Sequence, residues 1–130
     1  MVIVTGNQEN YLAKIEVERG TTYPSYADVP KERGGDNLYM RPGETLQGAL
    51  GSCMNITARR CLNRDNIPYD RVEVQIELSV EENVTHIYTN LEIIGKISSA
   101  DKERIIREVQ DCPVCKLLRG EIQLHTEMPK

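Results

Sequence analysis

Four cysteines carry the most reactive side chains of this 130-residue chain, and they fall into two groups. Cys53 and Cys61 lie in the stretch "LGSCMNITARRC", and Cys112 and Cys115 lie in "QDCPVCKLL". The thiolate form of cysteine is the nucleophile and the metal ligand of cysteine chemistry. The two groups therefore indicate a redox pair, metal ligands or buried side chains.

Cys112 has a local reason to be reactive. Proline is favoured at the first position of a helix, so "PVCKLLRG" predicts a short helix over residues 113–120 with Cys112 at its N-cap. The N-terminus of a helix carries about half a positive charge, which stabilises a thiolate. The alternative is a small buried residue at a helix junction, since free cysteine is among the most buried residue types. The spacing alone leaves both interpretations open.

Cys53 is expected on the apolar face of a helix, where a cysteine is more often part of the core than a catalyst. A nucleophilic thiol needs a nearby cation or hydrogen-bond donor in order to ionise. The loop that precedes this helix offers three candidates, Arg33, Arg41 and Glu44. Cys61, near the end of the same helix, is interpreted as structural.

The C-x-x-C sequence over residues 112–115 also allows a zinc site or a thioredoxin-like dithiol. Zinc needs four ligands, and Cys53, Cys61, His86 or His125 would have to complete the set, because the chain has no second C-x-x-C. Both histidines are expected at outward positions of strands, as surface residues. A thioredoxin-like dithiol follows a strand, whereas this one follows a predicted helix. We therefore predict neither a metal nor another cofactor.

Composition and charge exclude other functions. The net charge is −4 and no block of Lys or Arg occurs, so the sequence lacks the clustered cations of a nucleic-acid-binding protein. No apolar run approaches the roughly 20 residues of a membrane span. The N-terminus "MVIVTGNQEN" does not have the pattern of a signal peptide. We expect a cytoplasmic protein whose thiols are reduced at rest.

The length fits one domain over residues 1–130. Phe and Trp are absent, so we expect a modest core that a partner subunit completes. Strands are predicted at residues 2–5, at 11–20, where apolar residues alternate, and at 21–29, which Pro24 would confine to a sheet edge. Residues 30–43 hold two prolines and three glycines and are predicted to form a loop.

A helix is expected from about Glu44 to Asn63. Its apolar face follows the helical period and comprises Leu46, Ala49, Leu50, Cys53, Ile56 and Thr57. A second strip holds small residues, Gly48, Gly51 and Ser52, which would let another backbone approach closely. The helix is therefore expected to be buried on most sides.

The second half of the chain predicts a hairpin, two helices and a strand. Residues 71–82 alternate strictly, with Val72, Val74, Ile76, Leu78 and Val80 pointing inward, and residues 85–97 can pair with them. Ser98 or Ser99 is expected to cap a helix over residues 100–111, which Pro113 ends. Residues 121–128 are predicted as the last strand. The order of elements indicates an α+β fold with a mainly antiparallel sheet.

These residues together resemble the OsmC/Ohr family of thiol-dependent peroxidases. The stretch "PGETLQGALGSCMNITARR" is similar to the family's Pro-x-Glu-Leu-Leu…Ala-Leu-Gly-x-Cys helix, and "DCPVCKLLRGEIQL" is similar to its Cys-Pro-Val segment before a final strand. Between them, the hairpin and the "SSADKERI" helix fall where the family has theirs. The resemblance covers nearly the whole chain and is weakest before residue 31.

The resemblance implies an intertwined α+β homodimer, with two long central helices and active sites at the subunit interface. It implies that Cys53 attacks an organic hydroperoxide, that Cys112 resolves the sulfenic acid to a disulfide, and that an external dithiol resets the site. An Arg and a Glu assist in the family. Glu44 matches the Glu of the helix motif, and Arg33 is the best spacing match for the Arg.

Other arginines are open as alternatives. Related branches of the family place the Arg near the N-terminal hairpin, where Arg19 is the candidate, and Arg41 is possible from proximity. Glu44 and Cys53 would lie on opposite sides of one unbroken helix. Either the helix begins after Glu44, or Glu44 serves the Cys53 of the other subunit.

One departure from the family is a third thiol, because Cys115 stands where Ser, His or Tyr is common. It could compete with Cys112 as the resolving thiol or continue the exchange. The alternative function is that of an OsmC-like dimer that binds a small ligand or senses redox state without efficient turnover.

Overall fold

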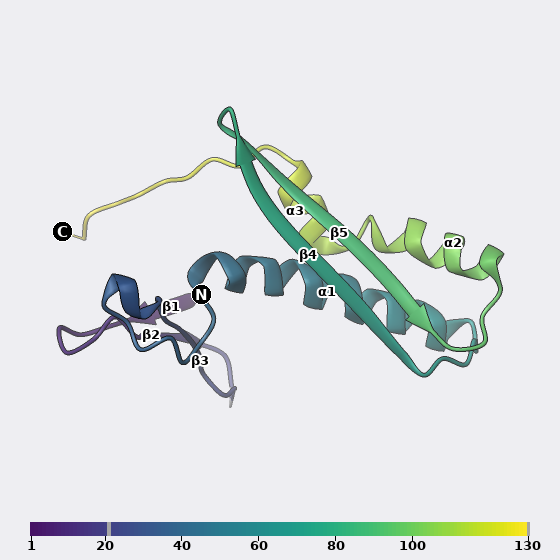
Figure 1. The fold of residues 1–130 in the computed structure, drawn as a ribbon, viewed down its shortest axis with the longest axis horizontal. Coiled ribbons are helices and arrows are strands. Elements are labelled where there is room, and N and C mark those ends of the chain that lie inside the picture. Colours follow the sequence, from purple (N-terminus) through teal and green to yellow (C-terminus); the bar gives the residue numbers. More distant parts are fainter. Residues whose placement is uncertain (21, 130) are drawn as a thin grey trace. The chain divides into compact units, whose positions relative to one another are not determined.

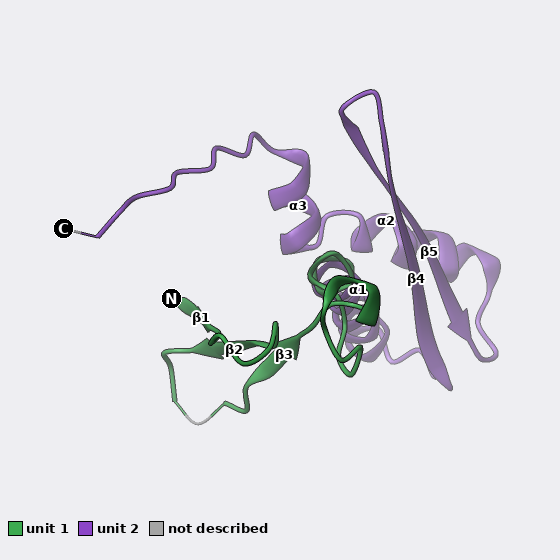
Figure 2. Cartoon of the chain, turned by 60° about the vertical axis from the view of Figure 1, so that its left-hand side comes forward, with its two compact units in different colours: residues 1–47 green, residues 48–130 purple. Residues whose placement is uncertain are grey.

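The computed structural model describes residues 1–20 and 22–129. The chain forms two compact units, unit 1 over residues 1–47 and unit 2 from residue 48 onwards (Figure 2). Helices and antiparallel strands are mixed, which confirms the α+β class. The single domain over residues 1–130 stays a prediction. Among the described residues, no helix has the length and apolar character needed to cross a membrane.

Unit 1 begins with three short antiparallel strands in the order β1-β2-β3 (Figure 1). They are β1 Val2–Thr5, β2 Ala13–Val17 and β3 Ser25–Ala27. All three predicted strands therefore exist, but β2 starts later than expected and β3 keeps only the residues after Pro24, at the edge of the sheet. Thr21, in the predicted third strand, lies outside the described residues.

The loop after β3 is organised by a buried carboxylate. Asp28 accepts hydrogen bonds from the backbone N–H groups of Val29, at 2.8 Å, and Asp36, at 3.3 Å. Gly35 lies so close to the Val29 carbonyl that a Cβ at this position would collide with it. The loop also contains a 3-10 helix, η1 Lys31–Arg33, which the loop prediction did not include.

The long helix α1 spans Pro42–Arg64, so it begins before Glu44. Pro42 stands at its first position, where the missing N–H costs nothing. The Glu44 carboxylate accepts a hydrogen bond of 2.9 Å from the backbone N–H of Arg41, as the third helical residue of a capping box does. Of the two alternatives for Glu44, the one in which the helix starts after this residue is therefore wrong, and its use by the other subunit stays a prediction.

The buried face of α1 is rotated from the predicted one. The buried residues are Leu50, Met54, Ala58, Cys61 and Leu62. Leu46 and Ile56, which were predicted on the apolar face, are exposed in the single chain, and Cys53 is partly buried at the border. Apolar residues occur around much of α1, so the face that becomes buried depends on where the hairpin and the later helices pack.

Unit 2 contains a long antiparallel hairpin, β4 Arg71–Glu81 and β5 Val84–Ile94. Glu82 and Asn83 form its two-residue turn, both with positive φ, as a type I′ turn requires. The hairpin runs along α1, where Gly51 admits the Ile76 side chain and the Asn55 amide donates to the Val72 carbonyl at 2.8 Å. The predicted hairpin is confirmed.

The inward side of the hairpin is buried only near its open end. Val72 is buried and Ile76 is half-buried, whereas Val80 is 63% exposed. The predicted alternation is therefore present in the backbone, but the part near the turn has no cover within the described residues of this chain.

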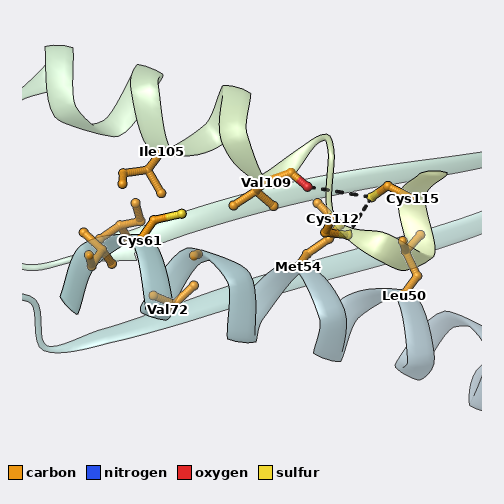
Figure 3. Packing of buried hydrophobic residues seen from close by; sticks show 11 residues of the cluster. Leu50, Met54, Cys61, Val72, Ile105, Val109, Cys112 and Cys115 are labelled. Carbon is orange, nitrogen blue, oxygen red and sulfur yellow. Dashed lines mark hydrogen bonds between the residues drawn. The ribbon is translucent and has the colours of Figure 1, made fainter. Parts of the chain in front are cut away.

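Two helices complete unit 2. Ser98 caps α2 Ser99–Val109, because its hydroxyl accepts from the Asp101 N–H at 3.1 Å. Helix α3 spans Pro113–Arg119, with Cys112 at the N-cap and Gly120 at the C-cap, as predicted. The core lies between α1, α2, α3 and the open end of the hairpin, where Figure 3 labels Ile105, Val109 and Cys112. These three and Leu62 are its largest fully buried side chains.

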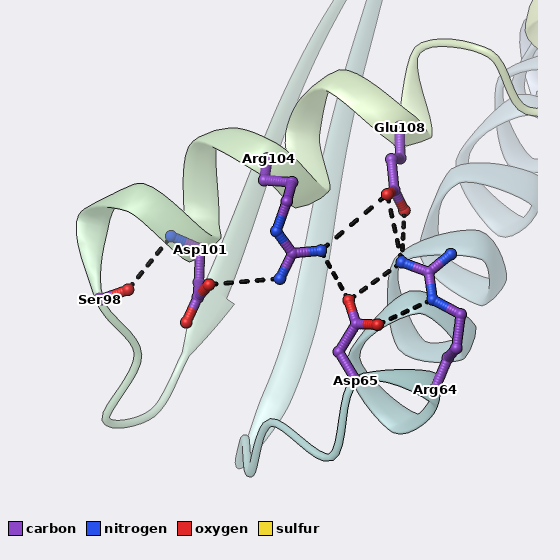
Figure 4. Close-up of polar contacts among 6 residues, drawn as sticks. All are labelled: Arg64, Asp65, Ser98, Asp101, Arg104 and Glu108. Atoms are coloured by element: carbon purple, nitrogen blue, oxygen red, sulfur yellow. Dashed lines mark hydrogen bonds and ion pairs between the residues drawn. The ribbon is translucent and has the colours of Figure 1, made fainter.

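A network of ion pairs joins the end of α1 to α2 (Figure 4). Asp65 pairs with Arg64 at 2.8 Å and with Arg104 at 2.6 Å, and Arg64 also pairs with Glu108 at 3.0 Å. The network lies beside the buried Cys61, since a hydrogen bond between Glu108 and Cys61 contributes to the shifted pKa of both groups.

The last predicted strand is wrong. Residues 121–129 form neither helix nor strand, and Leu124 is 91% exposed. An isolated extended segment gains no stability without a neighbouring strand to receive its backbone hydrogen bonds. No strand in the described part of this chain pairs with it. His125 therefore does not lie on a strand, whereas His86 lies on β5 and stacks on Tyr88.

Candidate functional site

Three thiols from distant parts of unit 2 meet beside the first turn of α3. We call Cys53, Cys112 and Cys115 the thiol cluster. The Sγ atoms of Cys112 and Cys115 lie 3.0 Å apart, and the Cys115 Sγ also lies 3.9 Å from the Val109 carbonyl oxygen (Figure 3). Cys53 interacts with the Cys112 thiol, and it packs against the same core. Cys112 therefore contacts both other members.

The local structure explains why Cys112 faces Cys115. Cys112 is the N-cap of α3 and has extended backbone angles, so its side chain turns back over the first helical turn. Cys115 is the third residue of that helix, the position toward which an N-cap side chain points. Cys112 is 1% exposed and Cys115 is 9% exposed, while Cys53 is only partly buried. Cys53 is thus the most accessible member of the cluster.

The surroundings of Cys53 act on its ionisation in opposite directions. Burial raises the pKa of Cys53, and the Cys112 thiol raises it further. Hydrogen bonds from the backbone N–H of Val114 and from Thr57 lower the pKa, but burial outweighs them. Within the described residues of unit 2, the groups that shift this pKa include no cation. Unit 2 alone therefore favours the neutral thiol.

Val114 is a contact of Cys53 that the sequence did not predict. Thr57 follows Cys53 by four residues on α1 and was expected on the same face, but not as a hydrogen-bond partner of the thiol. Val114 belongs to the first turn of α3, where backbone N–H groups lack partners within the helix. Its contact with Cys53 depends on how α3 packs on α1, which no local pattern encodes.

Unit 1 gathers the predicted polar residues around a separate hollow. Arg33, Arg41 and Glu44 line a hollow of about 430 Å³, together with Val29, Pro30, Pro42, Gly43 and Gln47. Arg33 ends η1 and Arg41 directly precedes α1, and the Asp28 carboxylate holds the backbone of the loop between them at Asp36. Arg19 is exposed after β2 and is not among these lining residues.

The Glu44 carboxylate is engaged with the backbone of Arg41, not with a guanidinium group. This use is structural, because it satisfies an N–H group at the start of α1. One carboxylate has several acceptor positions, so the same side chain can hold the helix terminus and also receive an arginine.

Cys61 lies outside the thiol cluster. It is buried against α2, and burial together with Glu108 raises its pKa. Among the residues that the structure describes, no group of three or more Cys, His, Asp or Glu side chains is arranged to hold a metal ion.

Comparisons with known proteins agree with this architecture. A family model described as "OsmC-like protein" matches residues 34–127. A comparison with curated proteins finds no match.

Solved structures share the fold. An OsmC-like protein from Mycoplasma pneumoniae superposes with a TM-score of 0.75 at 18% identity, over 92% of this chain and 86% of that chain. An organic hydroperoxide resistance protein from Elizabethkingia anophelis has a TM-score of 0.65 at 19% identity, over 94% and 89%. One from Legionella pneumophila has a TM-score of 0.63 at 19% identity, over 92% and 90%.

Proposed function

Because the chain belongs to the OsmC-like protein family, we propose that it is a thiol-dependent peroxidase that reduces organic hydroperoxides. The observation that carries this proposal is the thiol cluster, in which Cys53 and Cys112 interact although they lie far apart in the chain. The names of the solved structures from Elizabethkingia anophelis and Legionella pneumophila, which describe organic hydroperoxide resistance, support the same substrate class.

The proposed reaction has three steps. The Cys53 thiolate attacks the distal oxygen of the hydroperoxide, which breaks the O–O bond, releases an alcohol after proton uptake and leaves a sulfenic acid on Cys53. The Cys112 sulfur then attacks the sulfenic sulfur, which releases water and forms a Cys53–Cys112 disulfide. An external dithiol reduces this disulfide and resets the enzyme, as expected of a protein that works in the reducing cytoplasm.

The first step needs a cation, because the Cys53 pKa is raised in unit 2. We assign this role to Arg33, with Glu44 as the carboxylate that orients the guanidinium group. The support is that both side chains line the same hollow of unit 1. Arg41 lines that hollow too and is the alternative cation.

We further propose that the active form is an intertwined homodimer in which the long helices of two subunits pack together. Apolar side chains that one chain leaves exposed support this: Leu46, Ile56, Val80, Val84, Ile122 and Leu124. Residues 121–128 would find in the second subunit the neighbouring strand that they lack here. In such a dimer, Glu44 could serve the thiol cluster of the partner subunit.

Peroxide consumption tests the proposal directly. With cumene hydroperoxide and excess dithiothreitol, Cys53→Ser is expected to abolish turnover. Cys112→Ser, reduced and then freed of dithiol, is expected to consume about one equivalent of hydroperoxide and then stall with a sulfenic acid on Cys53. Cys61→Ser is the matched control, because Cys61 is also a free thiol on α1 but lies outside the thiol cluster. Full activity of Cys53→Ser would show that the proposed nucleophile is wrong.

A second candidate function is supported by the raised pKa of Cys53. A dimer that binds a small ligand or senses redox state without efficient turnover needs no thiolate at rest. The pH dependence of Cys53 alkylation by iodoacetamide separates the two functions. An ionisation below the ordinary thiol value near 8.5 supports the peroxidase, whereas one above it supports the second candidate.

A further inference from the structure

Cys115 is the member of the thiol cluster that the proposed reaction does not use. Its Sγ lies 3.0 Å from that of Cys112, and both residues belong to the same N-terminal turn of α3. A disulfide requires the sulfurs to approach to about 2.05 Å with no large movement of the backbone. Residues at the N-cap and third position of a helix meet this requirement through side-chain rotation.

Cys115 also differs from Cys112 in access. Cys112 is 1% exposed, so a reductant cannot attack it directly. Cys115 lines a hollow of about 260 Å³ that does not include Cys53 among its lining residues. The hollow has apolar walls from Leu50, Met54, Ile87 and Leu118 and polar groups from Thr85, Thr89, Gln110 and Arg119. A small dithiol could therefore reach Cys115 by a route separate from that of the peroxide.

On the basis of the proposed function, we infer that Cys115 completes a three-thiol relay. After Cys53 and Cys112 have formed a disulfide, the Cys115 thiolate attacks the Cys112 sulfur. The Cys112–Cys115 bond forms, the Cys53–Cys112 bond breaks, and Cys53 leaves as a thiolate. No external oxidant is needed, because the exchange moves the disulfide without changing its oxidation level. The external dithiol then reduces Cys112–Cys115 by attack at Cys115.

The relay has a functional consequence. Cys53 is returned to its reactive state before the reductant arrives, so oxidation and reduction use different sulfurs and different surfaces. Each oxidised subunit then stores its disulfide within the short segment over residues 112–115.

The relay can be tested by finding which cysteines are joined in tryptic peptides of the oxidised full-length protein. Cys112 and Cys115 fall in one peptide, residues 108–116, whereas Cys53 falls in residues 34–59, since Arg41 precedes a proline and resists cleavage. The protein is treated with one equivalent of cumene hydroperoxide, quenched with iodoacetamide and analysed by mass spectrometry. The relay predicts an internal disulfide in the peptide 108–116, lighter by two hydrogens, and alkylated Cys53. A cross-link between the two peptides with Cys115 alkylated would overturn the relay and leave the proposed function intact.

Three cysteine variants test whether the Cys112–Cys115 disulfide forms through Cys53 and whether the reductant attacks it at Cys115. Cys115→Ser is expected to accumulate the cross-linked peptides and to lower the steady-state rate with dithiothreitol several-fold, since the reductant must then attack the Cys53–Cys112 disulfide at Cys53, the sulfur that the peroxide also uses. Cys61→Ser is expected to match the wild type in both measurements. If Cys53→Ser still forms the 112–115 disulfide, the peroxide oxidises that pair directly and the relay is wrong. If no cysteine is oxidised in the wild type, the relay falls together with the proposed peroxidase.

Discussion

The two units of this chain hold their candidate functional residues in opposite ways. In unit 2 the thiol cluster is part of the core, so the packing of α1 against α3 sets the sulfur positions. In unit 1 the exposed residues Arg33, Arg41 and Glu44 line a hollow between the loop after β3 and the first turn of α1. The core can position atoms but raises the pKa of Cys53, whereas the loop carries the charges that a thiolate needs. Neither unit by itself has both the thiols and the cation that the proposed reaction needs.

The largest effect is expected from removing the positive charge that the loop of unit 1 is proposed to supply. Arg33→Met should raise the Cys53 pKa, and hydroperoxide consumption at neutral pH should slow about tenfold for each pH unit by which that pKa rises. Arg41→Met and Arg19→Met are matched variants that remove the same charge at the two alternative positions. Alkylation of Cys53 as a function of pH measures the change in its pKa, and peroxide consumption measures the rate.

Comparing the three variants shows which arginine contributes most to lowering the Cys53 pKa. If Arg41→Met or Arg19→Met has the larger effect, the assignment of Arg33 is wrong and the cation comes from that position. If all three leave both measurements unchanged, unit 1 does not supply the charge.

A smaller effect is expected from disturbing the loop of unit 1. Gly35→Ala places a Cβ against the Val29 carbonyl and the Asp28 carboxylate, which should cost about 1–3 kcal/mol of unfolding free energy. Gly43→Ala is the control, because a Cβ there meets open space and no loss of unfolding free energy is expected. Denaturant unfolding measures both.

The same variant sharpens the contrast between the units. Gly35→Ala should slow peroxide consumption but leave disulfide formation by the thiol oxidant diamide unchanged, because the thiol cluster lies in unit 2. A loss of diamide-driven disulfide formation would show that the sulfur positions also depend on the loop.

The smallest effect concerns the ion pairs that brace unit 2. Arg64, then Arg104, lowers the pKa of the Asp65 carboxyl below its ordinary value near 4. The ionised Asp65 carboxylate therefore contributes its full stabilisation of the folded state above the ordinary pKa near 4. This contribution is lost as the pH falls from there through the lowered pKa of the folded state. Asp65→Asn should lower the unfolding free energy at neutral pH by only a small amount, because the Arg64 and Asp65 side chains are partly exposed to solvent. The unfolding free energy of this variant should also fall less steeply than that of the wild type as the pH is lowered.

Thermal unfolding between pH 2 and pH 7 measures this effect. Asp70→Asn is the control, since Asp70 is an exposed carboxylate of the same unit outside the network. Equal acid sensitivity of Asp65→Asn and the wild type would show that the network does not link protonation to folding.

Local patterns in the sequence determined much of the fold. The capping residues Ser98 and Cys112, the proline at position 113 and the alternation over residues 71–82 each act on neighbouring backbone, so they predicted α2, α3 and β4 closely. The cysteine motifs and their family resemblance likewise indicated which thiols to examine.

The sequence failed where an element depends on a distant surface. The strand expected at residues 121–128 has no partner strand in the described part of this chain, and the buried face of α1 follows Met54 and Ala58 instead of Leu46 and Ile56. Periodicity shows that a helix is amphipathic or that a segment can be extended. It does not show which surface will cover the apolar side chains.

The sequence by itself determined the β4–β5 hairpin, the helices α2 and α3, and the position of Cys112 at a helix N-cap, because backbone sterics, capping and periodicity act over a few residues. Only the tertiary structure decided that Cys53 contacts Cys112, that Cys115 lies beside the same sulfur, and that Arg33, Arg41 and Glu44 surround one hollow. These contacts join segments far apart in the chain, and they depend on which surfaces pack together to exclude water.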